Sequence, residues 1–260
     1  MTQTKAADLL NPEVLADIVA GKLPKAIRFA PYAKVDTTLE GVAGDTITRP
    51  VYGYVGAAED LTEGVPMDPA KLSMTTTQVT VKEAGKAIEV TEKAIITNVA
   101  GTMDEAANQI TKAMADKLDI DYLASMAATL LSHDAAPVTA TAIIDAINLF
   151  GDEDEETYIL FINPKDYTGL SKSLIDGNTF LSQAQIAELV GVKEIVKTNR
   201  LVQGTAYVQK AGAVEIVYKK RPNIEKDHDI LARTFVLAGN NYYTTNLYNA
   251  NGVVKIVDSI

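Results

Sequence analysis

Residues 46–82 read TITRPVYGYVGAAEDLTEGVPMDPAKLSMTTTQVTVK, a stretch in which two extended arms flank a long tip. The arms, residues 46–55 and 73–82, are rich in Thr and Val, which favour strands. The tip, residues 56–72, is rich in Gly, Pro, Asp and Glu. A lone hairpin is marginal in water, and a connection of this length is usually functional or disordered. Because neither arm carries much apolar surface, we expect the hairpin to lie on another molecule.

A long helix is predicted over residues 102–131. Thr102 and Glu105 form a T-x-x-E capping box at its start. Apolar residues then recur at spacings of three or four, at Met103, Ala107, Ile110, Met114, Leu118, Tyr122, Met126 and Leu130. No Gly or Pro interrupts the pattern, so at 1.5 Å per residue it predicts a helix of roughly 45 Å.

The N-terminal residues, 1–35, are interpreted as an arm rather than a domain. Asn11 and Pro12 suit a helix cap and the first helical position. The apolar residues that follow fall on one face of a short helix. Such an arm is too apolar to stay free, so we expect it to pack on its own body or on a neighbour.

The rest of the chain alternates between short helices and strands. Helices are predicted over residues 139–150, 166–174 and 182–189, and strands over 158–162, 193–198 and 233–238. Two hairpins are predicted, one joining 206–209 to 214–218 and one joining 242–248 to 253–257 through Asn251-Gly252. These elements define an α+β fold with mixed helices and antiparallel strands.

Composition excludes several kinds of chemistry. The 260 residues include no Cys and two His, and 24 Lys+Arg against 34 Asp+Glu give a net charge of −10. The lack of Cys removes thiol nucleophiles and thiolate metal sites, and the acidic charge disfavours a nucleic-acid-binding role. The common nucleotide, serine-hydrolase and zinc-protease motifs do not occur. No apolar run is long enough for a signal peptide or a membrane span.

The two histidines have structural interpretations. His228, between Asp227 and Asp229, is expected in a solvated loop, because consecutive side chains rarely converge on one ion. His133 is expected at the end of the long helix, where a cation suits the helix dipole.

The charged clusters are also expected at the surface. The acidic run 152–156 is interpreted as a solvated connector, and the basic cluster 219–221 as a surface patch or a subunit contact. Glu59, Asp60 and Glu63 lie on a Gly/Pro-rich tip that offers no rigid pocket. We therefore expect no catalytic, cofactor or metal site, and a protein that acts through its surface.

Five motifs occur in an order that resembles tailed-phage major capsid proteins, above all the coliphage N-four-like family. They are L-E-G-x-x-G-D-T-I at 39–47, Y-x-G-x-A-E-D-L-x-E-G at 54–64, K-x-x-E-V-T-E at 86–92, F-I-N-P-K-D-Y at 161–167 and D-I-L-A-R at 229–233. The resemblance spans nearly the whole chain in the same order, and it is the ordered set of motifs that is specific.

The resemblance implies the Hong Kong 97-type capsid fold. Residues 1–35 would be the N-arm, 36–82 the start of the peripheral domain with the extended loop (hairpin about 46–82), and 83–136 the peripheral domain with the spine helix 102–131. Residues 137–232 would be the axial domain, and 233–260 the closing strands of the peripheral domain. The expected inter-subunit contacts are Tyr54, Glu59, Asp60, Leu61, Glu63, Met67, Lys71 and Leu72 of the loop, with Val14, Leu15, Ile18 and Ile27 of the arm.

The implied function is structural, not enzymatic: a major capsid subunit that forms pentamers and hexamers of an icosahedral shell around phage double-stranded DNA. The implied partners are further copies of the chain, a portal, and separate scaffolding or decoration proteins. The implied location is the virion, after assembly in the bacterial cytoplasm, with no membrane contact and no sequence-specific DNA binding.

The sequence departs from some capsid relatives in two respects, and two other functions remain as alternatives. The match begins almost at Met1, so scaffolding is expected to be separate or unnecessary, and Lys71, the lone lysine of the tip, is not expected to form a crosslink. One alternative is an encapsulin-like shell for protein cargo, which the neighbouring genes would reveal. The other is a soluble hydrolase that uses the acidic tip or His228, which would need a well-formed pocket around those groups.

Overall fold

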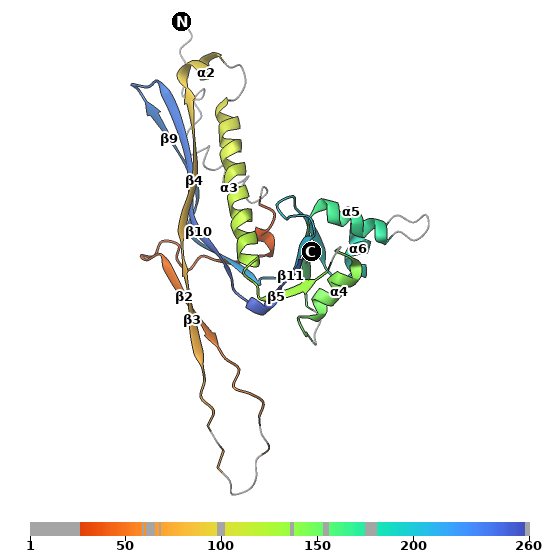
Figure 1. The fold of residues 1–260 in the computed structure, drawn as a ribbon. Coiled ribbons are helices and arrows are strands. Elements are labelled where there is room, and N and C mark those ends of the chain that lie inside the picture. Colours follow the sequence, from red (N-terminus) through yellow and green to blue (C-terminus); the bar gives the residue numbers. More distant parts are fainter. Residues whose placement is uncertain are drawn as a thin grey trace.

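The computed structural model describes residues 27–58, 60, 66–67, 69–97, 102–135, 138–152, 156–174 and 181–257. The predicted helix of the N-terminal arm lies outside these residues. The described chain forms two units, each built on its own sheet, and a hairpin extends away from both (Figure 1). The predicted α+β class is confirmed.

The first unit is a four-stranded sheet with a long helix beside it. Its strand order is β1 (Lys34–Asp36), β9 (Val214–Asp229), β10 (Thr234–Leu247) and β4 (Lys82–Thr91). Strand β10 pairs antiparallel with β9 on one side and with β4 on the other, and β1 lies parallel to β9. An irregularity in register between Asn240 and Tyr243 interrupts the β9–β10 ladder, and such bulges bend a ribbon. A short helix, α2 (Glu92–Thr97), follows β4.

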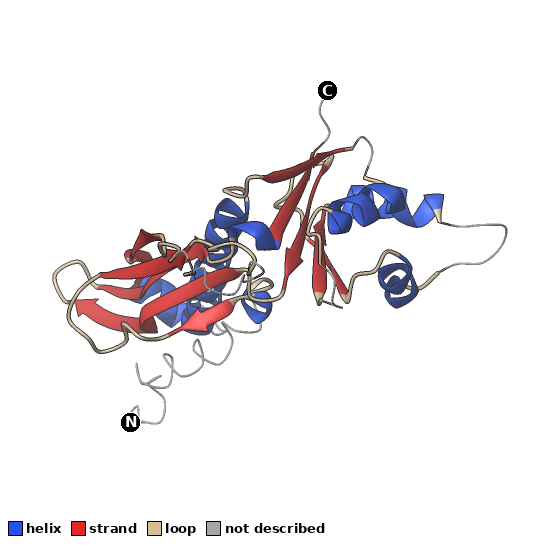
Figure 2. Cartoon of the chain, turned by 90° about the horizontal axis from the view of Figure 1, so that it is seen from below, coloured by secondary structure: helices blue, strands red, loops and turns tan. Residues whose placement is uncertain are grey.

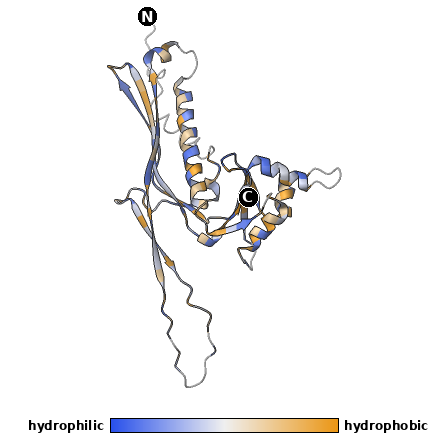
Figure 3. Cartoon of the chain, viewed as in Figure 1, coloured by the Kyte–Doolittle hydropathy of each residue, from blue (hydrophilic) through white to orange (hydrophobic). Residues whose placement is uncertain are grey.

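The long helix is α3 (Thr102–Met126), and its buried face is the predicted apolar stripe. Every stripe residue from Met103 to Met126 is buried, and Figure 3 shows hydrophobic and hydrophilic residues alternating along the helix. The helix ends five residues before the predicted position 131, and Leu130 is exposed. The predicted end was wrong because residues 131–134 form a strand, which places His133 in a sheet and not at a helix end.

The second unit is a five-stranded sheet. Its order is β5 (Leu131–Asp134), β11 (Val253–Val257), β8 (Thr205–Lys210), β6 (Tyr158–Ile162) and β7 (Glu194–Lys197). Three helices lie beside it, α4 (Ala140–Asn148), α5 (Pro164–Ser173) and α6 (Gln183–Leu189) (Figure 2). Each helix begins at a side-chain cap, from Thr139, Asn163 and Ser182 respectively. These predicted helices and the strands at 158–162 and 193–198 are confirmed.

Both predicted C-terminal hairpins are wrong, because their strands belong to different sheets. Strand β8 pairs with β6 and β11, whereas β9 pairs with β1 and β10; likewise β10 and β11 do not pair with each other. Residues 214–229 therefore lie in the first sheet, and 253–257 in the second. The segments 233–238 and 242–248 also merge into the single strand β10, and the expected loop at His228 is part of β9.

Two of the chain crossings between the sheets, from β8 to β9 and from β10 to β11, lie against each other at Ala213. The backbone amides of Tyr248 and Asn249 both donate to the Ala213 carbonyl, at 2.9 and 3.0 Å. A Cβ on Gly252 would lie 2.6 Å from the Ala213 Cβ, so only glycine allows this approach. The predicted Asn251-Gly252 turn is therefore a crossing, formed by a short 3-10 turn at Ala250–Gly252.

An aromatic cluster joins the two units. Phe29 is fully buried, stacks on Tyr122 of α3 with ring centroids 5.6 Å apart, and meets Phe161 of β6 edge-on at 5.2 Å. The Tyr122 hydroxyl donates to the buried Gln209 side chain of β8 at 2.9 Å. A short 3-10 turn, Ala30–Tyr32, follows Phe29. The segment before β1 is thus part of the core that positions both sheets.

Replacing Phe29 by alanine should lower the free energy of unfolding by about 3–5 kcal/mol, because it empties the centre of this cluster. Urea unfolding of the purified chain, followed by circular dichroism, measures the change. The control is Leu231→Ala, since Leu231 is almost fully exposed and its truncation should change stability by less than about 0.5 kcal/mol. Equal effects of the two variants would contradict the assigned core.

Candidate functional site

The extended hairpin forms a separate sheet, whose strands pair with no other strand of the described chain. Strands β2 (Thr46–Tyr52) and β3 (Met74–Thr80) pair antiparallel from Thr46↔Thr80 to Tyr52↔Met74. They form a two-stranded sheet of their own, which points away from both units (Figure 1). The predicted arms are confirmed, and the connection between the strands is slightly longer than the predicted tip.

Large apolar side chains on this hairpin are open to solvent. Among the predicted contact residues, Tyr54 is 85%, Met67 71% and Leu72 58% exposed. Four more apolar side chains of the hairpin are over half exposed: Val51, Tyr52, Val55 and Met74. Asp60 and Lys71 are also exposed. Several exposed apolar side chains on one element are typical of a surface that another protein covers.

The other predicted contact residues have a different placement. Ile27 is 7% exposed and packs in the same core cluster as Phe29, within its own chain. Val14, Leu15, Ile18, Glu59, Leu61 and Glu63 lie outside the described residues.

A partly buried ion cluster anchors the first arm of the hairpin. The Arg49 guanidinium on β2 donates to both carboxylate oxygens of Glu215 on β9, at 3.3 and 3.1 Å, and also to Asp36 on β1. The Glu215 side chain is fully buried. A buried carboxylate needs such a bidentate partner, because its desolvation is otherwise uncompensated.

The pKa values in this cluster reflect the same contacts. Hydrogen bonds from Thr38, then from Arg49, lower the pKa of Asp36 to about 2 against the opposing effect of burial. The bond to Asp36 raises the pKa of Arg49, which stays charged. Asp36 and Arg49 are therefore both ionised at neutral pH.

A second ion cluster anchors the other arm. Lys82, at the start of β4 and two residues beyond β3, lies 2.8 Å from Oδ2 of Asp121 on α3. Lys117 contacts the second oxygen at 2.8 Å, and the Tyr243 hydroxyl donates to Oδ2 at 2.7 Å. Burial raises the pKa of Asp121, but the bonds from Lys117, Lys82 and Tyr243 outweigh it and the net pKa is lowered.

The basic cluster at 219–221 holds the segment that leads into the hairpin. Lys219 donates to the Gly44 carbonyl, and Arg221 contacts Glu40 at 3.1 Å. Lys220 lies 3.7 Å from Glu225. These lysine and arginine side chains therefore form contacts within the chain.

Sequence reasoning missed Arg49, Glu215 and Asp121 as anchoring residues. The signal for Glu215 was its position inside the apolar run of residues 213–218, where an ionised side chain requires a partner. Nothing local identifies that partner, because Arg49 lies 166 residues away.

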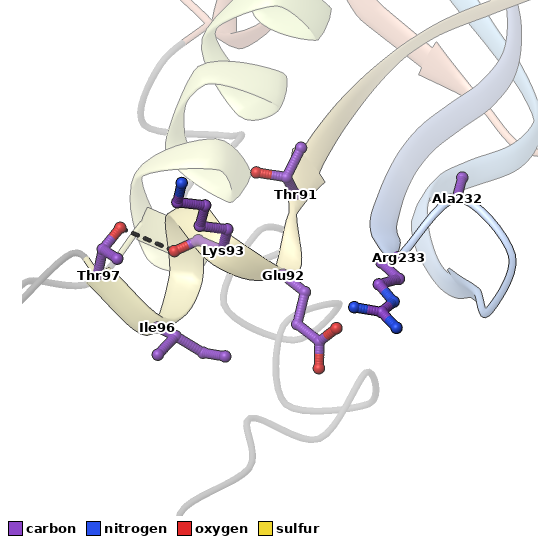
Figure 4. Close-up of a pocket in the computed structure, with 7 residues that line it drawn as sticks. All are labelled: Thr91, Glu92, Lys93, Ile96, Thr97, Ala232 and Arg233. Carbon is purple, nitrogen blue, oxygen red and sulfur yellow. Dashed lines mark hydrogen bonds between the residues drawn. The ribbon is translucent and has the colours of Figure 1, made fainter.

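The hydrolase alternative requires a pocket around the acidic tip or His228. A hollow of about 550 Å³ lies between α2 and the turn joining β9 to β10, where Thr91, Glu92, Lys93, Ile96, Thr97, Ala232 and Arg233 line it (Figure 4). Neither Asp60 nor His228 is among these lining residues. Instead, the His228 ring stacks on Phe235 of β10, with centroids 4.4 Å apart.

No helix among the described residues combines the length and apolar character needed to cross a membrane. Among the same residues, no group of three or more His, Asp or Glu side chains is placed to hold a metal ion.

Comparison with known proteins gives the class of the molecule. A solved capsid structure of Cyanophage P-SCSP1u superposes with a TM-score of 0.73 at 15% identity, covering 99% of this chain and 93% of that one. A virus-like particle from Pyrococcus furiosus superposes with a TM-score of 0.68 at 11% identity, covering 94% and 98%. The long helix beside the sheet, the extended hairpin and the second α/β unit are thus those of a Hong Kong 97-type capsid fold.

Sequence comparison gives the family. Residues 74–256 match the family described as phage capsid protein. The major capsid protein of Staphylococcus phage phiMR11 is 31% identical over 261 residues, covering 97% of this chain and 95% of that protein. The chain belongs to the phage capsid protein family.

Replacing Arg49 by methionine should destabilise the chain by about 3 kcal/mol, because Glu215 is left buried without its partner. Urea unfolding measures the change. The matched control is Arg221→Met, whose ion pair is exposed and contributes less than about 1 kcal/mol. Adding Glu215→Gln to Arg49→Met should recover part of the loss; no recovery would contradict the assigned pair.

The anchor of the first arm should weaken in acid. Because the pKa of Asp36 is lower in the folded chain, its contribution is complete above the unfolded value near 4 and disappears as the pH falls towards about 2. The change should be on the order of 1 kcal/mol, since solvent screens this pair. Unfolding free energies measured between pH 5 and 2 should fall less steeply in Asp36→Asn. Identical slopes in the two proteins would contradict the assignment.

Proposed function

We propose that copies of this chain contact one another through the extended hairpin and assemble, as pentamers and hexamers, into the shell that encloses phage double-stranded DNA. As a phage major capsid protein, the chain is a structural subunit of an icosahedral shell. The observation that carries the proposal is the hairpin itself, whose apolar side chains are exposed while two ion clusters fix its base.

The contact residues proposed on the loop are Tyr54, Glu59, Asp60, Leu61, Glu63, Met67, Lys71 and Leu72, with Val14, Leu15 and Ile18 on the arm. What supports the described ones is exposure: a free monomer gains nothing from Tyr54, Met67 and Leu72 in water, whereas a neighbour that covers them gains about 25 cal/mol for each Å² of apolar area. Repetition of one contact around a closed shell allows each contact to be weak.

The two units suit different places in such a shell. We assign the five-stranded unit with α4, α5 and α6 to the axial domain, around the five-fold and six-fold axes. The four-stranded unit with α3 is assigned to the peripheral domain, with β9 and β10 as its longest strands.

We also propose a place of assembly, partners and a mode of DNA enclosure for the chain. The chain acts as a structural protein without catalysis, assembles in the bacterial cytoplasm, and works with a portal and with separate scaffolding or decoration proteins. Its net charge of −10 supports a shell interior with little attraction for phosphate, so DNA can enter and leave without sequence-specific binding. The ordered motifs, from residues 39–47 to 229–233, support a position near the coliphage N-four-like capsid proteins.

Deleting residues 57–67 should leave a folded, soluble subunit that fails to close shells, because the anchors of both arms remain while the exposed tip is lost. Negative-stain electron microscopy and sedimentation of the purified chain and of the variant provide the measurement. A second variant replaces the same residues with a Gly/Ser segment of equal length, which keeps the reach of the loop and removes its side chains. Normal shells from the deletion variant would contradict the proposal.

A further inference from the structure

The two outer edges of the hairpin differ in the backbone groups that they present. The hydrogen bonds at the ends of the hairpin show which residues face these edges. The Gly53 amide donates to the Ser73 carbonyl at 2.9 Å, and the Val81 amide donates to the Asp45 carbonyl at 2.8 Å. Both pairs continue the regular β2–β3 register. In antiparallel pairs, hydrogen-bonded positions alternate with positions whose backbone groups point outwards. Odd-numbered residues of β2 and β3 therefore bond each other, and even-numbered residues face the two outer edges.

The outer edge of β2 is blocked by Pro50. This residue has an even number, so the N–H that it lacks is one that would face outwards. Proline at an edge is a common protection against pairing with another strand. Pro50 therefore removes no bond within the hairpin and closes the β2 edge to a partner.

The outer edge of β3 carries no such protection. Thr76, Gln78 and Thr80 are exposed and direct their amides and carbonyls outwards. Within the described chain, β2 is the sole strand that pairs with β3. An open strand edge of this kind binds extended segments through main-chain hydrogen bonds.

The outer edge of β3 is continuous with the edge of β4 that pairs with β10. The Glu92 amide donates to the Arg233 carbonyl at 2.9 Å, and the β4–β10 register is regular from there back to Lys82↔Tyr243. Even-numbered residues of β4 therefore face β10. Because the outward residues of β3 are also even-numbered, the edge that β10 occupies along β4 extends past Thr80, where no described strand pairs with it.

The outer edge of β3 is also suited to pairing with a second copy of the chain, which carries the same net negative charge. Residues 74–80 contain no ionisable side chain, whereas each copy carries a net charge of −10. Two copies therefore meet here without placing like charges opposite one another, a cost that cross-strand pairs otherwise incur.

We propose that the outer edge of β3 is a strand-addition site that takes an extended segment of a second copy of this chain, in line with β10, while the edge of β2 stays free. This inference rests on the proposed shell assembly. It specifies the backbone contact between the hairpin and a neighbouring subunit.

Amide hydrogen exchange at single-residue resolution, on free subunits and on assembled shells, tests the inference. The outward amides of Thr76, Gln78 and Thr80 should exchange at least about tenfold more slowly in shells, while those of Thr48 and Tyr52 on β2 keep their free-subunit rates. Shells in which the β3 amides are unchanged, or the β2 amides are protected instead, would overturn it. A chain that forms no shells, even when co-expressed with its scaffolding and portal proteins, would overturn the proposed assembly, and this inference with it.

Two matched proline variants test the same point. Gln78→Pro and Thr48→Pro each remove one outward N–H and leave the internal β2–β3 bonds in place. Gln78→Pro should reduce shell yield at least about tenfold relative to Thr48→Pro, with equal unfolding midpoints. Equal yields from the two folded variants would overturn the inference. Should either fail to fold, the exchange measurement on the unmodified chain decides.

Discussion

The bidentate contact between Arg49 and Glu215 is the interaction on which the shape of this molecule depends. A two-stranded hairpin has no core of its own and is barely stable in water. Here Arg49 of β2 holds the hairpin against the main sheet, because the buried carboxylate of Glu215 would otherwise lose its hydrogen-bonding partner. Lys82 and Asp121 fix the other arm to α3 in the same way. Ion pairs thus hold the base of the hairpin, and the apolar side chains of the hairpin remain exposed.

The two sheets are joined near Ala213 and through an aromatic cluster. The chain passes between them at adjacent points around Ala213, and the aromatic cluster of Phe29, Tyr122 and Phe161 fills the space between α3 and β6. Phe29 comes from the segment just before β1, so even the N-terminal part of the described chain contributes to this junction. Each unit therefore has a fixed position relative to the other, which a subunit that tiles a closed surface requires.

The sequence predicted those elements whose signal is local. The α3 stripe, the buried strand β6 and the Thr-rich hairpin arms all follow from periodicity or composition. It did not predict strand partners, since β9 follows β8 after a turn yet enters the other sheet. Asn251-Gly252 had the chemistry of a hairpin turn, but the close approach to Ala213 uses that glycine for a crossing. The exposed loop residues were anticipated, whereas the anchors join residues as far as 166 positions apart and leave no local pattern.

The length of β9 and β10 has a mechanical meaning. Their ladder runs from Thr234↔Asp229 to Leu247↔Val214, and β4 adds a second ladder that leads directly into the hairpin. Bonds between antiparallel strands lie perpendicular to the strands, so tension along the hairpin loads the whole ladder in shear. A ladder in shear breaks many bonds together, whereas one pulled apart from its end opens bond by bond. If tension in a filled shell passes along the hairpin, these two ladders carry it in shear.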